Sequence, residues 1–358
     1  MNREVIAKRV NKLRRELNKK KINCLLMTKP ANVTYATGFL GDDSWAMIAG
    51  GRIYLLTDSR YTEQAQKECP SCKIIDRAGP MGEAVAKLLQ KLKSVRTLTV
   101  EKSTSLAEFE QLKTAVKARL RTVANLVETV RSVKDESEIA AIRSAAAVSA
   151  KALEQTLPFI KPGVTESELA GVLDLQIRKL GARNGFETIV AFGPNGSRPH
   201  HQPSKRRLRK KDAVLIDFGA RYKGYCSDIT RCFVVGKPTA FYAKVYDVVE
   251  QAQAAAIKTI KAGVKLTQVD AAARQVIDRS RLPVYGHGTG HGFGLEIHED
   301  PFLKADAKGK LKAGQVLTIE PGVYIPGKLG VRVEDDILVT GTGYKILTSR
   351  CPHSPLLS

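Results

Sequence analysis

The chain has 358 residues, of which 43% are hydrophobic, enough for one large core or two of ordinary size. It contains no run near the roughly 18 apolar residues that a membrane-spanning helix needs. Its charged N-terminus lacks the apolar segment of a secretory signal, so we expect a cytoplasmic protein. The net charge of +22 would attract polyanions. However, aromatic residues make up only 6% of the chain and do not interleave with basic runs such as Lys205–Lys211, as base stacking requires. We therefore expect solvated basic faces, no nucleic-acid partner and no membrane partner.

The six cysteines are too few and too dispersed for a disulfide scaffold. Cys69 and Cys72 form a single CxxC pair that follows a predicted helix rather than opening one, and no second pair completes a zinc ribbon. We interpret the pair as two reduced cysteines at a turn, with a redox or zinc site as the alternative.

Short strands and helices alternate over the first 130 residues, which predicts an α/β domain spanning 1–130. Apolar residues at helical spacing indicate helices, and short alternating runs indicate strands, including a hairpin about Gly50-Gly51. No histidine and few paired acids occur here, so we expect no catalytic set in this domain. In chain order we expect a helix at 6–17, a strand at 22–27, strands at 45–48 and 53–56, a helix at 60–68, a strand at 73–75, a helix at 83–92, a strand at 98–100 and a helix at 106–116.

A second domain is expected over 131–358, which makes the whole chain α/β (α+β). Asp135 with Glu138 and Thr165 with Glu168 have the spacing of capping boxes, in which each side chain bonds a backbone N–H of the other residue. Helices are therefore expected to begin at these two places and to run to about 157 and 180. Further on we expect strands within 212–235, helices at 245–262 and 268–279, and strands with glycine-rich loops over 285–347.

Two acids lie on neighbouring apolar segments that the sequence predicts to be strands. Asp217 lies in the segment 212–219 and Asp228 in the segment 225–235, with Arg221–Gly224 between them. A four-residue turn that ends in glycine suits type I. In the resulting antiparallel register Asp217 and Asp228 would face each other, with Cβ atoms about 4.5–5.5 Å apart.

A second pair of acids shows the same arrangement. Glu320 ends one apolar segment and Glu334 lies in another, and a turn centred on Gly327 places them opposite each other. Like charges opposite one another destabilise a sheet, and burying them costs several kcal/mol more. Two such pairs therefore indicate bound cations. The alternative is that each acid takes up a proton or pairs with a base such as Arg231 or Arg332.

A glycine-rich stretch, 285–294, offers His287 and His291 four residues apart. It matches neither the HExxH zinc motif nor the GxGxxG dinucleotide loop, and its alternative interpretation is a close-packed turn with incidental histidines. Carboxylates with one imidazole suit Mn²⁺, Co²⁺ or Zn²⁺. Four carboxylates also balance the charge of two divalent ions.

Several motifs together resemble the aminopeptidase P/prolidase family of metallopeptidases with the pita-bread fold. In the first domain, Tyr35-Ala-Thr-Gly-Phe39 and Thr57-Asp-Ser-Arg-Tyr-Thr-Glu63 resemble that family's creatinase-type N-terminal domain. In the second domain the motifs are Ile216-Asp-Phe-Gly219, Ser227-Asp-Ile-Thr-Arg231, Gly290-His-Gly292, Glu296-Ile-His-Glu299, Ile319-Glu-Pro-Gly-Val-Tyr324 and Val331-Arg-Val-Glu-Asp-Asp336.

The resemblance implies a pair of divalent metal ions. Mn²⁺ is the first candidate, and Co²⁺ and Zn²⁺ are the alternatives. Asp217 would bind one ion and His291 the other. Asp228 and Glu334 would bridge the two ions, and Glu320 would bind the ion held by His291.

The resemblance also implies roles for side chains around the metals. His200 and His298 would hydrogen-bond the substrate, and Glu320 would transfer a proton. The residues expected to contact the substrate are His287, Tyr324 and Arg332. For the three histidines the alternative is an ordinary polar residue in a loop.

The implied activity is removal of the first residue from peptides with proline in the second position. The main alternative is an Xaa-Pro dipeptidase (prolidase). Two others are a non-catalytic pita-bread binding protein and a creatinase-like hydrolase without metal, and the complete ligand set argues against both. The resemblance further implies a homodimer.

Overall fold

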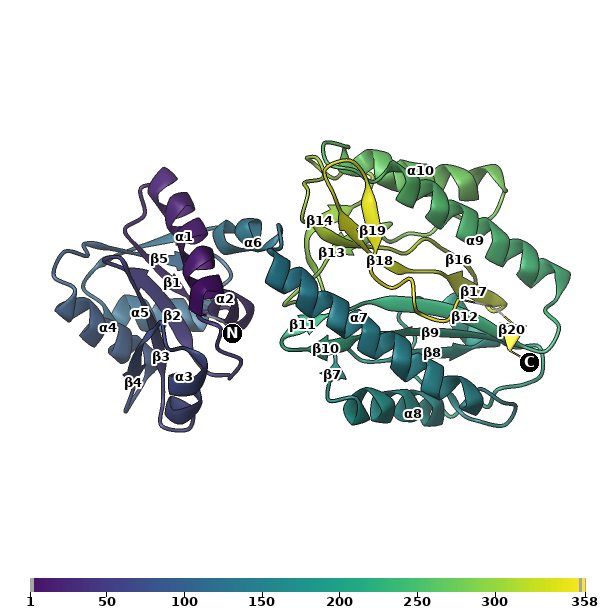
Figure 1. The fold of residues 1–358 in the computed structure, drawn as a ribbon, viewed down its shortest axis with the longest axis horizontal. Coiled ribbons are helices and arrows are strands. Elements are labelled where there is room, and N and C mark those ends of the chain that lie inside the picture. The colour runs from purple at the N-terminus through teal and green to yellow at the C-terminus, as the bar shows by residue number, and fades with distance from the viewer. Residues whose placement is uncertain (1–2, 354–355, 358) are drawn as a thin grey trace. The chain divides into compact units, whose positions relative to one another are not determined.

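The computed structural model describes residues 3–353 and 356–357 of the chain. It separates into two compact units, Met1–Arg131 and Ser132–Ser358, and each is described by itself below (Figure 1).

The first unit is a six-stranded mixed sheet in the order β4-β3-β2-β1-β5-β6. The expected hairpin is confirmed, because β2 and β3 pair antiparallel on either side of Gly50-Gly51. Helices α1, α2 and α6 pack against one another, and α4 packs against α5. The elements are α1 (Arg3–Lys19), β1 (Cys24–Met27), α2 (Pro30–Thr37), β2 (Trp45–Ala49), β3 (Arg52–Thr57), α3 (Thr62–Glu68), β4 (Lys73–Asp76), α4 (Met81–Lys91), β5 (Thr97–Glu101), α5 (Leu106–Ala115), β6 (Arg119–Val123) and α6 (Leu126–Arg131).

Three of these elements, α2, β6 and α6, were not predicted. Most of the α2 residues are buried on every side, so their sequence shows no helical stripe of apolar residues. The strand β6 and the helix α6 are too short for a periodic pattern to stand out. The CxxC pair lies at a turn after α3, where the Cys72 N–H donates to the Cys69 carbonyl at 2.9 Å, and both thiols are free.

The second unit places helices on the outside of two main sheets. Both predicted capping boxes are confirmed, with Asp135 preceding α7 and Thr165 preceding α8. The α-helices are α7 (Glu136–Thr156), α8 (Glu166–Lys179), α9 (Ala240–Thr259) and α10 (Leu266–Arg279), and two 3₁₀ turns occupy Leu157–Phe159 and Gly193–Ser197.

One main sheet has the strand order β20-β12-β9-β8, and the other has the order β14-β13-β15-β18-β19. The smaller groups are β11-β10-β7 and the hairpin β16-β17. The strands are β7 (Arg183–Asn184), β8 (Ile189–Phe192), β9 (Ala213–Phe218), β10 (Ala220–Tyr222), β11 (Tyr225–Cys226), β12 (Ile229–Val235), β13 (Gly290–Gly292), β14 (Glu299–Leu303), β15 (Val316–Ile319), β16 (Gly322–Ile325), β17 (Leu329–Arg332), β18 (Asp335–Val339), β19 (Tyr344–Ile346) and β20 (Leu356–Leu357).

The strand β9 shows how the layers are built. Val214, Ile216 and Phe218 pack with residues of α7 and α8, whereas Ala213 and Leu215 pack with residues of α9, α10 and the second sheet. Successive side chains of a strand point to opposite faces, so Asp217 shares the second face with Leu215. In Figure 1 the strands of this unit lie between the pair α7 and α8 and the pair α9 and α10.

The predicted register of the first acid hairpin is wrong. Asp217 pairs with Thr230 instead of Asp228, because the turn centres on Lys223 and Gly224, which have φ values of 50° and 87°. Two positive φ values are typical of a type I′ hairpin turn rather than type I. A slip of two residues keeps every side chain on its face, so Asp217 and Asp228 are diagonal neighbours on one face, a spacing of about 7–8 Å.

The predicted register of the second acid hairpin is confirmed. The pairs Gly322↔Arg332 and Ile319↔Asp335 lie on either side of the two glutamates and belong to one continuous register. Glu320 and Glu334 therefore stand opposite each other at the point where the two ladders meet.

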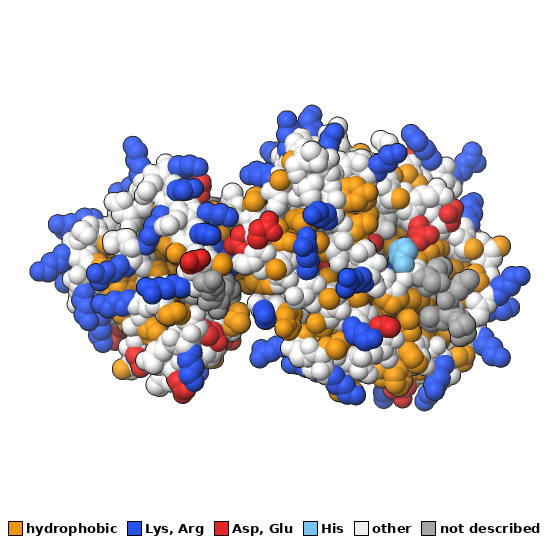
Figure 2. All heavy atoms as spheres, viewed as in Figure 1, with side chains coloured by type: hydrophobic (Ala, Val, Ile, Leu, Met, Phe, Trp, Pro, Cys, Tyr) orange, Lys and Arg blue, Asp and Glu red, His pale blue; other side chains and the backbone are white. Residues whose placement is uncertain are grey.

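Basic side chains are spread over both units on the face shown in Figure 2. Part of the run Lys205–Lys211 is occupied by local contacts: Arg206 pairs with Asp212 at 2.8 Å, and Arg207 donates to the Gly163 carbonyl at 2.7 Å. Among the helices in the described ranges, none has the length and apolar character needed to cross a membrane.

Candidate metal centre

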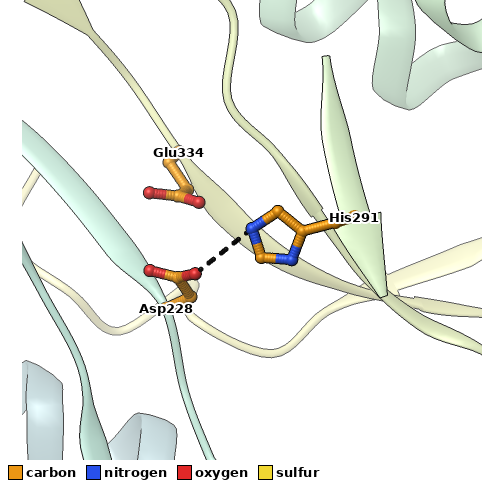
Figure 3. Close-up of side chains that lie close together, drawn as sticks. All are labelled: Asp228, His291 and Glu334. Atoms are coloured by element: carbon orange, nitrogen blue, oxygen red, sulfur yellow. Dashed lines mark ion pairs between the residues drawn. The ribbon is translucent and has the colours of Figure 1, made fainter. Parts of the chain in front are cut away.

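Asp228, His291 and Glu334 form the centre of the site. Each offers one ligand atom, and these atoms all lie within 4.8 Å of one another (Figure 3). Asp228 immediately precedes β12, His291 lies in β13, and Glu334 lies between β17 and β18. Three segments far apart in the sequence therefore bring together two carboxylates and one imidazole, a donor set that suits a divalent cation.

The other two predicted ligands, Asp217 and Glu320, line the same cavity. A Glu320 oxygen lies 3.4 Å from His291 Nε2, and an Asp228 oxygen lies 3.6 Å from the same nitrogen. The Thr318 hydroxyl donates to Glu320 at 3.2 Å. All five predicted ligands thus surround one space.

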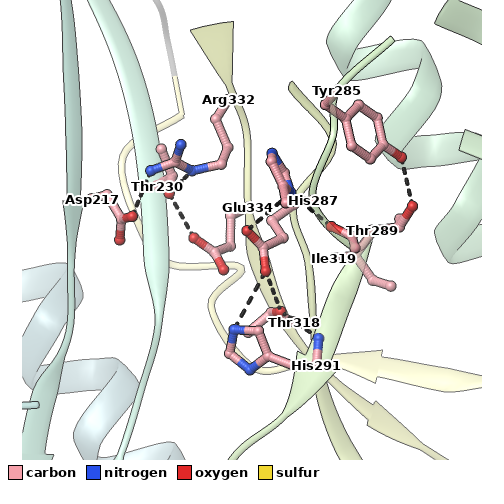
Figure 4. A network of polar contacts seen from close by, with 12 residues as sticks. Asp217, Thr230, Tyr285, His287, Thr289, His291, Thr318, Ile319, Arg332 and Glu334 are labelled. Carbon is pink, nitrogen blue, oxygen red and sulfur yellow. Dashed lines mark hydrogen bonds and ion pairs between the residues drawn. The ribbon is translucent and has the colours of Figure 1, made fainter. Parts of the chain in front are cut away.

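Arg332, in the hairpin β16-β17, connects this hairpin to strands β9 and β12 at the edge of this space (Figure 4). Its guanidinium donates to Asp217 Oδ2 at 2.5 Å, to the Thr230 hydroxyl at 3.0 Å and to the Tyr324 hydroxyl at 2.8 Å. The Thr230 hydroxyl in turn donates to Glu334 at 2.6 Å. The alternative weighed from sequence is therefore partly realised, because Arg332 does pair with one acid, and Arg231 pairs with Asp335 at 2.7 Å.

The electrostatics show that one arginine does not neutralise the cluster. Burial raises the pKa of Asp228, Glu334 and Glu320, and neighbouring carboxylates add to the effect at Asp228 and Glu334. Furthermore, Asp217 Oδ1 is buried and has no hydrogen-bond partner among the described residues. Buried carboxylate oxygens are normally satisfied, so the orphaned atom and the crowded acids fit a site built for cations.

The glycines around His291 allow the sheet to close. A side chain at Gly290 would put its Cβ 1.9 Å from the Thr318 carbonyl oxygen, so only glycine permits this approach of β13 to β15. The close packing weighed from sequence is real, and it holds His291 in the cluster. Burial lowers the pKa of His291, which favours the neutral imidazole that binds metals.

The cavity has a volume of about 480 Å³. Its lining includes His200, His287, His298 and Arg332 beside the five candidate ligands. The rings of His298 and His291 are 4.4 Å apart. His200 and His298 are exposed side chains that face this space.

Tyr324 differs from the other predicted substrate contacts, because it is not part of the cavity lining. Its hydroxyl lies between His287 Nε2, at 2.9 Å, and the Arg332 guanidinium. Tyr324 therefore orients two residues that face the cavity.

Sequence reasoning missed Thr230 and Asp336. Thr230 was hidden by the wrong register, since it stands opposite Asp217 where Asp228 was expected. Asp336 accepts hydrogen bonds of 3.3 Å from the Asp228 N–H. The Ser-Asp-Ile-Thr and Glu-Asp-Asp motifs contain both residues, so their position beside ligand candidates was the available signal.

Comparison with known proteins identifies the family of the chain. Residues 140–341 match metallopeptidase family M24, and residues 9–133 match the Creatinase/Prolidase N-terminal domain. The chain therefore belongs to metallopeptidase family M24, and both the expected pita-bread fold with a creatinase-type N-terminal domain and the expected enzyme class are confirmed.

Several relatives match over nearly their whole length. The chain is 37% identical to the uncharacterized peptidase YqhT of Bacillus subtilis, over 97% of this chain and 98% of that protein. A structure of an Xaa-Pro dipeptidase from Bacillus anthracis shares 37% identity with a TM-score of 0.94, covering 98% of this chain and 100% of that one. An X-Pro aminopeptidase structure from Thermotoga maritima shares 35% identity with a TM-score of 0.89, covering 96% and 100%.

Proposed function

We propose that this protein is a dinuclear-metal peptidase that hydrolyses the bond between an N-terminal residue and a following proline. The observation that carries the proposal is the gathering of four carboxylates and one imidazole around a single cavity. The names of the Bacillus anthracis and Thermotoga maritima relatives supply the Xaa-Pro specificity.

Asp217, Asp228, His291, Glu320 and Glu334 would hold two divalent ions, with Mn²⁺ the first candidate. The unsatisfied Asp217 Oδ1 supports a role for that carboxylate beyond its pair with Arg332. When bound, such ions supply an acidified water and polarise the scissile carbonyl.

The side chains around the ions would then act on the substrate. Glu320 would accept the proton of the attacking water and return it to the proline nitrogen. His200 and His298 would donate hydrogen bonds to the reacting carbonyl and to the tetrahedral intermediate. The apolar side chains of Phe186, Ile297 and Phe302 line the same cavity and suit a proline ring.

The length of the substrate separates two candidate activities. A dipeptide ends in a free proline carboxylate, which a cationic side chain beside it would stabilise. Among the described residues that line the cavity, Arg332 is the one Lys or Arg, and it already bonds Asp217, Thr230 and Tyr324. This favours the aminopeptidase, which acts on longer peptides.

The second candidate is the Xaa-Pro dipeptidase, which the name of the Bacillus anthracis relative favours. The decisive experiment compares Ala-Pro with Ala-Pro-Ala and longer peptides, on protein whose metal content is measured in the same sample. Cleavage of the dipeptide alone would establish the dipeptidase. Protein that carries no divalent ion and cleaves neither substrate would contradict the proposal. A homodimer remains a further proposal, which light scattering would check.

A further inference from the structure

His200 lies in a turn that follows the 3₁₀ helix Gly193–Ser197, outside any strand or α-helix. We define the His200 loop as residues 193–204, which follow β8 and lead into the basic run. Pro199 and His200 line the cavity from this loop. The His200 side chain is itself exposed, so packing does not fix its position.

One buried carboxylate, Glu166, bonds both ends of the loop. Glu166 is the first residue of α8, and its side chain is 0% exposed. Its Oε1 accepts the Phe192 N–H at 2.7 Å and the Asn195 side-chain amide at 2.8 Å. Its Oε2 accepts His201 Nε2 at 2.8 Å, and the Ser204 N–H and hydroxyl at 3.0 and 2.5 Å.

Two further bonds transmit this anchoring to the residues beside His200. The Asn195 side chain accepts from the Arg198 guanidinium at 2.6 Å. The His201 N–H donates to the Arg198 carbonyl at 3.1 Å and closes the turn that contains His200. The two oxygens of Glu166 therefore hold the residues on both sides of His200.

The Glu166 carboxylate is well placed to keep its charge. Burial raises its pKa, but hydrogen bonds from His201, Ser204 and Asn195 outweigh burial, so its pKa lies below the ordinary value. An acidic residue in the first turn also interacts favourably with the helix dipole. In a Gln side chain at this position, an NH₂ group would replace one of the two accepting oxygens. If this group replaced Oε2, it would face the donors of His201 and Ser204 and could not accept their hydrogen bonds.

We propose that Glu166 and His201 are positioning residues, which hold His200 where it contacts the substrate. This inference rests on the proposed function for the role of His200, but its structural part can be tested without any substrate. The bond between His201 Nε2 and Glu166 is the central link, because His201 is the immediate neighbour of His200 and is itself buried.

A double-mutant cycle separates positioning from general stability. Glu166→Gln is expected to lower kcat by up to about 100-fold, the effect of displacing a group by about 1 Å, with metal content unchanged. In a His200→Ala background the same substitution is expected to change kcat less than twofold. Losses that multiply in the double variant would overturn the proposal, because they would show that Glu166 acts independently of His200.

His201 provides a second test that perturbs the fold less than removal of Glu166. His201→Ala is expected to lower kcat with KM little changed, and His201→Gln is expected to recover most of the activity, since its amide can donate to Glu166. If His201→Gln recovers nothing, the hydrogen bond is not the cause and the proposal fails.

Hydrogen exchange of residues 196–204 supplies the readout without substrate. Glu166→Gln and His201→Ala are expected to raise exchange there at least tenfold. The matched control is Glu168→Ala, which removes the two bonds that the Glu168 carboxylate accepts from Thr165 in the same helical turn and should leave exchange in the loop unchanged. Equal exchange in wild type and Glu166→Gln would overturn the proposal.

If wild type cleaves no Xaa-Pro peptide, the proposed function fails, and the exchange comparison still decides whether Glu166 holds the loop.

Discussion

Arg332 donates a hydrogen bond of 2.5 Å to one oxygen of Asp217, while the other oxygen of that carboxylate is buried and finds no partner in the part of the chain that the structure describes. Such a carboxylate can form an ion pair through one oxygen and still offer the other oxygen to a metal ion. The consequences of this arrangement can be measured with and without metal.

Arg332→Met is expected to destabilise metal-free protein strongly, because it leaves the Asp217 charge buried beside three other acids. Removing one partner of a buried pair costs about 3–5 kcal/mol. Added Mn²⁺ should recover part of this loss, since the ions replace the positive charge. Thermal unfolding with and without Mn²⁺ measures the difference. Arg231→Met is the control: it breaks the buried pair with Asp335, and equal recovery by Mn²⁺ in both variants would contradict the expectation.

Thr230→Val keeps the shape of the side chain but removes the hydroxyl that links Arg332 to Glu334. An unsatisfied buried partner costs about 1–3 kcal/mol, and loss of such a partner of a ligand typically weakens metal binding about 10–100-fold. Titration calorimetry with Mn²⁺ measures the affinity. Thr156→Val removes a hydroxyl that donates to the Ala152 carbonyl in α7, away from the candidate ligands, so its metal affinity should match wild type.

Asp228→Asn should lose metal and activity together, since a neutral amide lacks the negative charge that would hold a cation. The metal-free variant should nevertheless be at least as stable as metal-free wild type at pH 7, because one of the crowded charges is gone. Metal analysis, a peptide assay and thermal unfolding on the same preparation test both halves. A variant that retains two ions per chain would show that Asp228 is not a ligand.

The pH dependence of stability should differ between metal-free and metal-loaded protein. Burial raises the pKa of Asp228, Glu320 and Glu334 in the folded state, so between their unfolded values of about 4 and the raised values the folded state binds more protons. Stability of metal-free protein should therefore fall as pH rises through that window. Bound ions should remove this fall, because they compete with the protons. Unfolding curves from pH 4 to 8, with chelator or with Mn²⁺, give the comparison.

His298→Ala is expected to keep the metal ions and lose turnover. The side chain faces the cavity and packs on the His291 ring, but none of the five candidate ligands depends on it for a hydrogen bond within the described residues. Full turnover in a variant with normal metal content would remove His298 from the mechanism.

The sequence predicted those parts of the site that follow from local rules. The capping boxes at Asp135 and Thr165, and the register about Gly327, depend on neighbouring residues alone. The register of the first acid hairpin was mispredicted because a lysine, Lys223, occupies a positive φ that sequence rules assign to Gly, Asn or Asp.

The residues that sequence could not identify depend on contacts between distant segments. Glu166 sits beside a recognised capping box, yet its burial and its bonds come from a loop some 30 residues further on. Thr230 matters because its hydroxyl bonds Arg332 and Glu334, both about 100 residues away. The pattern of residues along the chain does not indicate such contacts between distant segments.

The five candidate ligands come from the middle and the C-terminal part of the second unit, and the helices α9 and α10 separate Asp217 and Asp228 from the rest along the chain. A nascent chain therefore has no complete set of donors until its last third has been made and both sheets have met. Binding of an ion at this site would therefore require a fully assembled second unit. A truncated chain lacking Glu334 would keep the repulsion between the remaining carboxylates but would lack the complete set of ligands that binds the neutralising cations.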